Sequence, residues 1–150
     1  MLNVGQIEEG YVLDHIKAGQ SLSIYHHLQL DKKDATVAMI MNARSGKMGK
    51  KDILKVECKV EEVDLDVLAV IDRNITVNVV KDGNITEKKV LTLPSEIHRV
   101  FKCKNPRCIT SIEQELPHVF FLSDEAKGIY RCRYCEEKFD MRSLERVKIR

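Results

Sequence analysis

Hydrophobic residues in the first part of the chain follow two periods, and each period predicts one kind of element. Runs that alternate with polar residues, or that are rich in β-branched side chains, predict strands because such side chains suit a pleated surface. The predicted strands lie at residues 11–16, 35–41, 53–60, 75–80 and 85–91. Asp82 and Gly83 separate the last two runs, and this pair is typical of a tight hairpin turn.

Two further segments carry apolar residues at helical spacing. Residues 21–30 predict one helix, with Ser21 in position to cap its N-terminus. Its apolar positions are Leu22, Tyr25, Leu28 and Leu30. Asp64 can cap a second helix, whose apolar positions are Leu65, Leu68 and Ala69. This order of elements is ferredoxin-like, so an α+β fold is predicted, with one antiparallel sheet, an added hairpin strand and two helices on one face.

Pro94 marks the expected boundary between two domains, residues 1–93 and residues 99–150. Proline has no N–H to donate and fixes its own φ, so it interrupts the strand pattern around it. After this boundary the sequence predicts a small β domain. Its expected elements are strands at residues 119–122 and 128–131 and a charged terminal helix at residues 141–149. About 50 residues with few large apolar side chains make a marginal core.

Four of the five cysteines form two close pairs in this second domain. Cys103 and Cys108 enclose four residues, Cys132 and Cys135 enclose two, and 23 residues separate the pairs. This spacing suits a tetrahedral zinc site, because each tight turn presents two thiolates and the connector brings the turns together. Four cysteine ligands leave no coordination position for water or substrate. The pattern therefore predicts one structural Zn²⁺ per chain, on which folding of the small β domain depends.

The fifth cysteine, Cys58, alternates with Val56 and Val60, which predicts a small buried residue on one face of a strand. The sequence shows no secretion signal, and no apolar run approaches the length of a membrane span. Cysteines used as metal ligands suit a reducing compartment, so a cytoplasmic protein is expected. The pairing by itself leaves disulfide bridges open as an alternative.

Net charge is small in both parts of the chain. Residues 1–98 hold 13 Lys and Arg against 15 Asp and Glu, and residues 99–150 hold 12 against 8. Four thiolates with one zinc ion reduce the second surplus to about +2, which is too little to indicate nucleic-acid binding. A zinc ribbon that contacts nucleic acid is still an alternative, but the same cations can complement an acidic protein surface. These cations are Lys102, Lys104, Arg107, Arg131 and Arg133.

Residues with catalytic potential are scattered, so an enzyme is the weaker alternative. The five histidines form no nucleophile or metal constellation that sequence can reveal. Residues 43–52 form a basic, glycine-punctuated loop that lacks the spacing and the Ser or Thr of a phosphate-binding Walker motif. This loop can be a solvated surface, or Lys51 and Lys55 can join Asp14 and His15 to bind a small anion at the sheet edge.

The same residues carry a resemblance to a known family. Along nearly its whole length the chain resembles the regulatory chains of aspartate carbamoyltransferase. The similar stretches are residues 12–16, 45–57, 75–78, 93–94, 103–109 and 132–139, with Ile97. The cysteine spacing alone would fit many zinc ribbons. The resemblance becomes specific through the Ser-Gly-x-Met-Gly-x-Lys-Asp run at residues 45–52, which follows Asp14 and His15.

The resemblance implies a non-catalytic regulatory subunit in pyrimidine biosynthesis. It implies that domain 1–93 binds nucleotide effectors such as CTP, UTP or ATP and forms a homodimer. It also implies that the zinc domain, 99–150, docks onto the catalytic chain, and it implies neither nucleic acid nor a membrane as a partner. By position, Asp14 and Lys55 would contact the ribose. The phosphates would meet His15, Lys51 and Lys88, and the base or sugar would lie beside Val4, Ile7, Asn78, Val80 and Ile85.

Overall fold

The computed structural model describes residues 6–60, 64–141, 144 and 146, and Val4 lies outside them. The chain divides into two compact units, residues 1–91 and residues 92–150. The strands of the first unit are β1 (Gly10–Lys17), β2 (Thr36–Ser45), β3 (Gly49–Glu57), β4 (Thr76–Lys81) and β5 (Asn84–Val90). Its helices are α1 (Ser21–His27), the 3-10 turn η1 (Leu30–Lys32) and α2 (Leu65–Ile71).

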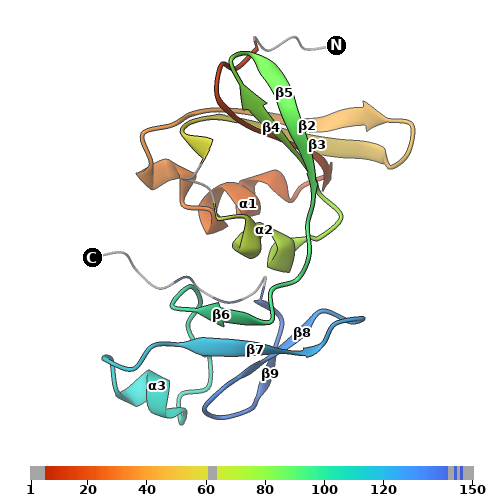
Figure 1. Ribbon diagram of the computed structural model, residues 1–150. Coiled ribbons are helices and arrows are strands. Elements are labelled where there is room, and N and C mark those ends of the chain that lie inside the picture. The colour runs from red at the N-terminus through yellow and green to blue at the C-terminus, as the bar shows by residue number, and fades with distance from the viewer. Residues whose placement is uncertain (1–5, 61–63, 142–143, 145, 147–150) are drawn as a thin grey trace. The chain divides into compact units, whose positions relative to one another are not determined.

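The five strands form one sheet in the order β2-β3-β1-β4-β5, and all neighbouring strands are antiparallel. Helices α1 and α2 pack against each other and lie on the same face of the sheet (Figure 1). This is the ferredoxin-like order with β5 added at one edge, so the predicted α+β architecture is confirmed. The side chains of Leu13, Leu54 and Val77 are fully buried on the helix-covered face.

The central strand, β1, contains one extra residue where it passes β3. Leu13 pairs with Leu54, but Ile16 pairs with Asp52, so Asp14 and His15 together face a single partner position. His15 adopts the left-handed conformation, with φ 58°. Such a β-bulge shifts the alternation of side chains by one residue. Leu13 and Ile16 therefore both reach the core, while Asp14 and His15 are half-buried.

The first helix differs from the prediction at both of its ends. It ends at His27, and Leu30 begins η1 after Gln29 has turned the chain with φ 55°. Ser21 is the first helical residue and not the cap, because Gln20 occupies the cap position. The Ser21 hydroxyl donates to Asp52 Oδ2 over 2.6 Å instead. Leu22 is 51% exposed, although helical spacing had grouped it with Leu28 and Leu30, which are buried.

Asp52 is a fully buried carboxylate that joins α1 to β2. Its Oδ2 accepts hydrogen bonds from the Gly19 N–H and from both the N–H and the hydroxyl of Ser21. Its Oδ1 accepts a hydrogen bond of 2.9 Å from the Asn42 N–H. Burial alone would raise the pKa of Asp52, but these hydrogen bonds outweigh burial and lower it. The carboxylate therefore stabilises the fold in its charged form.

The two hairpins of the sheet differ in how well the sequence predicts them. The basic loop predicted at residues 43–52 is confirmed only as a turn at residues 46–48, because β2 continues to Ser45 and β3 begins at Gly49. Apolar content had marked only the first part of β2 and the last part of β3. The β4–β5 hairpin is confirmed, and both Asp82 and Gly83 have positive φ, as a two-residue hairpin turn of this kind requires.

The second helix and Cys58 give one confirmation and one correction. Asp64 Oδ1 accepts hydrogen bonds from the N–H groups of Asp66 and Val67, which confirms the predicted cap of α2. Cys58, predicted to be buried within a strand, lies just after β3 and is half-buried. Its N–H donates to the Glu9 carbonyl over 3.2 Å, so a loop contact holds this part of the chain.

The second unit is built on a smaller antiparallel sheet in the order β6-β7-β8-β9. Its elements are β6 (Glu96–His98), α3 (Ile109–Ile112), β7 (Val119–Asp124), β8 (Ile129–Cys132) and β9 (Lys138–Phe139). Strands β7 and β8 confirm the two predicted runs. Phe101, Phe120 and Tyr130 are fully buried, and the Tyr130 hydroxyl donates to the Pro94 carbonyl over 2.6 Å.

Two predictions for the second unit need correction. Residues 93–97 were expected to interrupt the strand pattern, but Glu96–His98 forms the edge strand β6. The terminal helix expected at residues 141–149 falls largely outside the described residues. Where that segment is described, Arg146 forms an antiparallel bridge with Phe101, which is extended pairing. Among the described residues, no helix combines the length and the apolar character that crossing a membrane requires.

We predict that Asp52→Asn destabilises the first unit by about 2–3 kcal/mol at pH 7, because the single oxygen of an amide cannot accept all four donors that now surround the carboxylate and its NH2 group would face donors. The folded pKa of Asp52 is lowered, so its contribution is complete above about pH 4 and is lost as the pH falls through the folded pKa. The measurement is amide hydrogen exchange of β3 in the parent chain and in the Asp52→Asn variant between pH 3 and 7.

Asp34→Asn is the matched control, because Asp34 is exposed and surface substitutions change stability by about 0.5 kcal/mol or less. The deficit of the Asp52 variant should shrink towards acidic pH. Equal exchange protection in the parent and the Asp52 variant at all pH values would show that the buried carboxylate contributes nothing.

Candidate functional site

The four paired cysteines of the second unit meet in a single cluster. Their sulfur atoms all lie within 4.8 Å of one another. The Cys103 and Cys135 sulfurs are 3.8 Å apart, and those of Cys108 and Cys132 are 3.7 Å apart. A tetrahedral site with metal–sulfur bonds of about 2.3 Å places its sulfurs about 3.8 Å apart. All four cysteines are free thiols, so the disulfide alternative does not apply to this structure.

Two tight turns present these sulfurs. In the first, the Cys108 N–H donates to the Asn105 carbonyl, and the Asn105 side chain accepts from the Arg107 N–H. Cys108 is then the residue before the first turn of α3. In the second, the Glu136 N–H donates to the carbonyl of Cys132, and Glu136 has φ 60°. Local hydrogen bonds therefore fix each pair, and the β sheet brings the pairs together.

Electrostatics in the cluster favour a bound cation. Burial raises the pKa of the Cys103 and Cys132 thiols. Burial acts in the same direction on Cys108, but hydrogen bonds from the Thr110 hydroxyl and N–H outweigh it and lower the pKa of Cys108. Four thiolates this close repel one another unless a cation lies between them. The sulfur donors and their spacing fit a soft divalent metal ion such as zinc.

His118 supports the first turn from outside the cluster. Its Nδ1 accepts a hydrogen bond of 3.1 Å from the Cys103 N–H, so this nitrogen must be unprotonated. Burial, together with the nearby charge of Lys102, lowers the pKa of His118 and favours the neutral ring. Sequence analysis gave His118 no role, because the histidine and Cys103 lie 15 residues apart.

A second group of polar residues lies on the face of the first unit's sheet opposite the helices. Val12 of β1 pairs with Lys55 of β3 on one side and with Asn78 of β4 on the other. Asn78 in turn pairs with Lys88 of β5. Directly paired residues point to the same face of a sheet. The row Lys55, Val12, Asn78 and Lys88 therefore crosses four strands, on the opposite face from buried Leu13.

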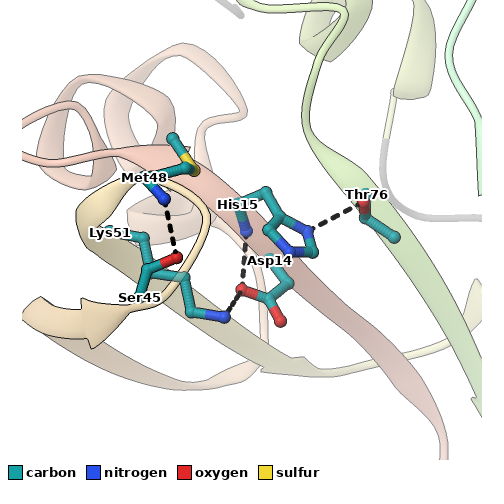
Figure 2. Close-up of polar contacts among 6 residues, drawn as sticks. All are labelled: Asp14, His15, Ser45, Met48, Lys51 and Thr76. Carbon is teal, nitrogen blue, oxygen red and sulfur yellow. Dashed lines mark hydrogen bonds and ion pairs between the residues drawn. The ribbon is translucent and has the colours of Figure 1, made fainter.

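The bulge of β1 adds Asp14 and His15 beside this row. Lys51 Nζ lies 2.9 Å from Asp14 Oδ1, which also accepts the His15 N–H. The His15 ring nitrogen Nδ1 lies 3.0 Å from the Thr76 hydroxyl on β4 (Figure 2). Burial raises the pKa of Asp14, but the Lys51 ammonium and the His15 N–H lower it by more. Asp14 is therefore an ionised acceptor.

The turn of the β2–β3 hairpin lies close to this group. Figure 2 shows Ser45 and Met48 beside Lys51, with the Met48 N–H donating to the Ser45 hydroxyl over 3.2 Å. The turn is part of the run at residues 45–52 that made the resemblance specific. Its hydrogen bond helps to define where β3 begins and hence where Lys51 points.

The remaining predicted residues have different surroundings. Val80 pairs with Gly10 and with Ile85, and it is only 4% exposed. Ile85 is 64% exposed on the edge strand β5. Ile7 precedes β1 and is half-buried, and Val4 lies outside the described residues.

The first unit matches over residues 2–92 the family model described as aspartate carbamoyltransferase regulatory chain, allosteric domain. Residues 95–145 match the model described as the metal binding domain of the same chain. The chain belongs to this family. Its members are regulatory chains, which confirms the resemblance and the prediction that the chain is not itself an enzyme. The enzyme's name also places the chain in pyrimidine biosynthesis.

Similar proteins span the chain almost completely. The aspartate carbamoyltransferase regulatory chain of Clostridium tetani is 48% identical over 137 residues, which cover 91% of this chain and 95% of the relative. That of Clostridium botulinum is 51% identical, with 91% and 93% covered. That of Bifidobacterium longum is 42% identical, with 91% and 98% covered.

In this regulatory chain, the fold brings together most of the residues selected from the sequence. The contact of Thr76 with His15 was missed, since the two residues lie 61 positions apart and only the β1–β4 register joins them. The hydroxyl of Thr110 beside Cys108 was missed as well. A threonine two residues after a cysteine carries no recognisable sequence signal.

We predict that Lys51→Met raises the pKa of Asp14, because the ammonium group at 2.9 Å stabilises the charged carboxylate. The measurement is an NMR titration that follows the Asp14 carboxyl carbon in both chains. Lys47→Met is the matched control, because Lys47 is an exposed lysine in the turn of the same hairpin. An Asp14 titration that is identical in parent and Lys51 variant would show that the ion pair has no influence in solution.

Proposed function

We propose that this chain binds nucleotide effectors on the open face of its first unit and communicates their presence to the catalytic chain of aspartate carbamoyltransferase. The observation that carries the proposal is the row of Lys55, Asn78 and Lys88 beside the Asp14–Lys51 pair, in a domain of the family's allosteric type. Cations and hydrogen-bonding groups on one face suit an anionic ligand that also has a sugar and a base.

The proposed contacts follow from the chemistry of each side chain. Both contacts to Asp14 engage Oδ1, so Oδ2 can accept a ribose hydroxyl, with Lys55 nearby on the same face. Lys51, Lys88 and His15 are the proposed phosphate ligands, because ammonium groups act as point charges for phosphate oxygens. Asn78 carries an amide that can donate and accept. The residues proposed to border the base or sugar are Val4, Ile7, Asn78, Val80 and Ile85.

We further propose that the four cysteines bind one structural zinc ion. The sulfur–sulfur distances of 3.7 and 3.8 Å support this assignment, because they equal the edge of a zinc–thiolate tetrahedron. When bound, zinc would neutralise the thiolates and hold the two turns together, and a site closed by four sulfurs supports no catalysis. Free thiol ligands also support a cytoplasmic location.

The second unit is proposed to dock onto the catalytic chain near the metal. Ile109 and Ile112 of α3 are 44% and 62% exposed, and Tyr134 between two ligands is 42% exposed. Exposed apolar side chains beside cations such as Lys104 and Arg107 suit a protein surface that is partly apolar and partly acidic. A nucleic-acid ribbon would instead bind through the cations alone, with an affinity that falls steeply as salt increases.

The first unit is proposed to form the homodimer of regulatory chains. Strand β5 lies at the edge of the sheet, and its residue Val90 is 86% exposed. An edge strand offers unpaired N–H and C=O groups together with apolar side chains, which a second copy can cover.

We predict that Lys55→Ala and Lys88→Ala each weaken the binding of CTP or ATP by about 1.5–3 kcal/mol, the range for a lost charge-assisted hydrogen bond. Isothermal titration calorimetry on the full chain measures the change. Lys47→Ala is the control, because it removes an exposed lysine from the hairpin turn and not from the row. Parental affinity in both row variants would show that the nucleotide site lies elsewhere.

The same variants test the regulatory role after reconstitution with the catalytic chain. Nucleotide should shift the aspartate saturation curve of the parent complex, with a coupling of about 1–3 kcal/mol. The row variants should need more nucleotide for the same shift. A saturation curve that CTP, UTP and ATP all leave unchanged would contradict regulation even if the nucleotides bind.

We predict that metal analysis of the purified chain finds one zinc ion and that a chelator unfolds residues 92–150 while the first unit still binds nucleotide. The physical reason is that the small second unit has a marginal core and that four metal-free thiolates repel one another. Chelation should also release the catalytic chain, which size-exclusion chromatography detects. A zinc-free chain whose second unit remains folded and docked would contradict the assignment.

A further inference from the structure

Thr110 contacts the sulfur cluster without being one of its ligands. Its hydroxyl oxygen lies 3.0 Å from Cys108 Sγ, and the residue is 3% exposed. Thr110 is the second residue of α3, which begins immediately after Cys108. The helix turn therefore holds both partners of this contact, and the hydroxyl is shielded from water.

The direction of the hydrogen bond follows from the state of the sulfur. A metal-bound cysteine is a thiolate and has no proton to donate, so the Thr110 hydroxyl must donate to Cys108 Sγ. Four thiolates and one divalent cation leave a net charge of about −2 in a largely buried site. A buried charge of this size needs hydrogen-bond donors around it. In the described part of the chain, the hydroxyl of Thr110 provides such a donor to a ligand sulfur.

We propose that Thr110 is a positioning residue of the metal centre, whose hydroxyl orients the Cys108 thiolate and strengthens the binding of the metal ion. This inference rests on the proposed zinc site. Hydrogen-bond partners of metal ligands typically change metal affinity by about 10–100-fold when they are replaced. The stiff β-branched side chain suits the role, because few rotamers compete with the one that reaches sulfur.

The neighbouring Ser111 provides a matched control within the same turn of helix. Its hydroxyl donates to the Asn105 carbonyl over 2.7 Å, so this hydrogen bond goes to the backbone and not to a sulfur. Ser111→Ala and Thr110→Val each remove one hydroxyl from α3. Only the second substitution removes a donor from a metal ligand, and Thr110→Ser keeps that donor.

The test is competition for zinc between the full-length chain and the chromophoric chelator 4-(2-pyridylazo)resorcinol. Thr110→Val should bind zinc about 10–100-fold more weakly than the parent, while Thr110→Ser should stay within about threefold. The Ser111→Ala variant should also keep near-parental affinity. Parental affinity in Thr110→Val, or an equal loss in Ser111→Ala, would overturn the inference.

Cobalt substitution adds a readout that a merely structural role would not change. Loss of a hydrogen bond raises the energy of the sulfur lone pairs, so the thiolate-to-cobalt charge-transfer band of Thr110→Val should move to longer wavelength. The bands of Thr110→Ser and Ser111→Ala should stay at the parental wavelength. An unshifted band in Thr110→Val would count against the inference.

Two further outcomes are separable from these. If Thr110→Val fails to fold even with excess metal, Thr110→Ser decides the question: recovery of parental affinity supports the role of the hydroxyl, and equal failure overturns it. If the parent chain binds no zinc, the proposed metal site itself is wrong. If the parent binds zinc and all variants bind it equally well, only the role of Thr110 is wrong.

Discussion

The fold of the first unit depends on how its central strand, β1, forms hydrogen-bonded ladders with two neighbouring strands at once. Strand β1 pairs with β3 and β4, and between Leu13 and Ile16 it accommodates one residue more than β3 does. This bulge lets both Leu13 and Ile16 enter the core, and it places Asp14 and His15 near the open face. Without the extra residue, alternation from Leu13 would put His15 in the core and Ile16 outside. The hydrophobic core and the polar face are therefore set by the same local irregularity.

Strand β3 extends this arrangement to both sides of the sheet. Lys51 and Asp52 are adjacent, so their side chains point to opposite faces. Lys51 forms an ion pair with Asp14 on the open face. Asp52 instead accepts four hydrogen bonds from the start of α1 and from β2. A shift in the register of β3 would disturb the ion pair and the helix attachment together. This shared dependence gives a physical reason why the two residues occur as neighbours in the run at 45–52.

The second unit has a small core, and its stability is proposed to depend on the metal cluster as well as on apolar burial. Its described core rests on a few aromatic residues, including Phe101, Phe120 and Tyr130, and its strands are short. A domain of this size gains limited stability from apolar burial. A metal held by four sulfurs would add covalent-like links between two turns that lie far apart in sequence. The contact of Thr110 with Cys108 is proposed to stabilise the second unit in the same way, because it stabilises the charged sulfur on which those links depend.

The sequence by itself determined most of the elements and the chemistry of the metal cluster. Period and turn residues are local signals, so β1, β4, β5, β7, β8 and the Asp64 cap of α2 could be predicted from neighbouring residues. Close cysteine pairs are local as well. Local charge had made Asp14, His15, Lys51 and Lys55 candidates for an anion site. The other candidate effector residues came from family resemblance, and no local pattern would have selected Asn78 or Lys88.

Tertiary structure decided the features that depend on pairing between distant segments. Ser21 carries a good capping side chain, but its hydroxyl binds Asp52, which lies 31 residues away. Residues 43–52 look like a loop because they are polar, yet the β2–β3 ladder continues to the pair Ser45 and Gly49, next to the turn of the hairpin. The contact of His15 with Thr76 and the position of Lys55 in its row arise from strand register. Register depends on which strands pair and where a bulge occurs, and these are properties of the assembled sheet that no single segment contains.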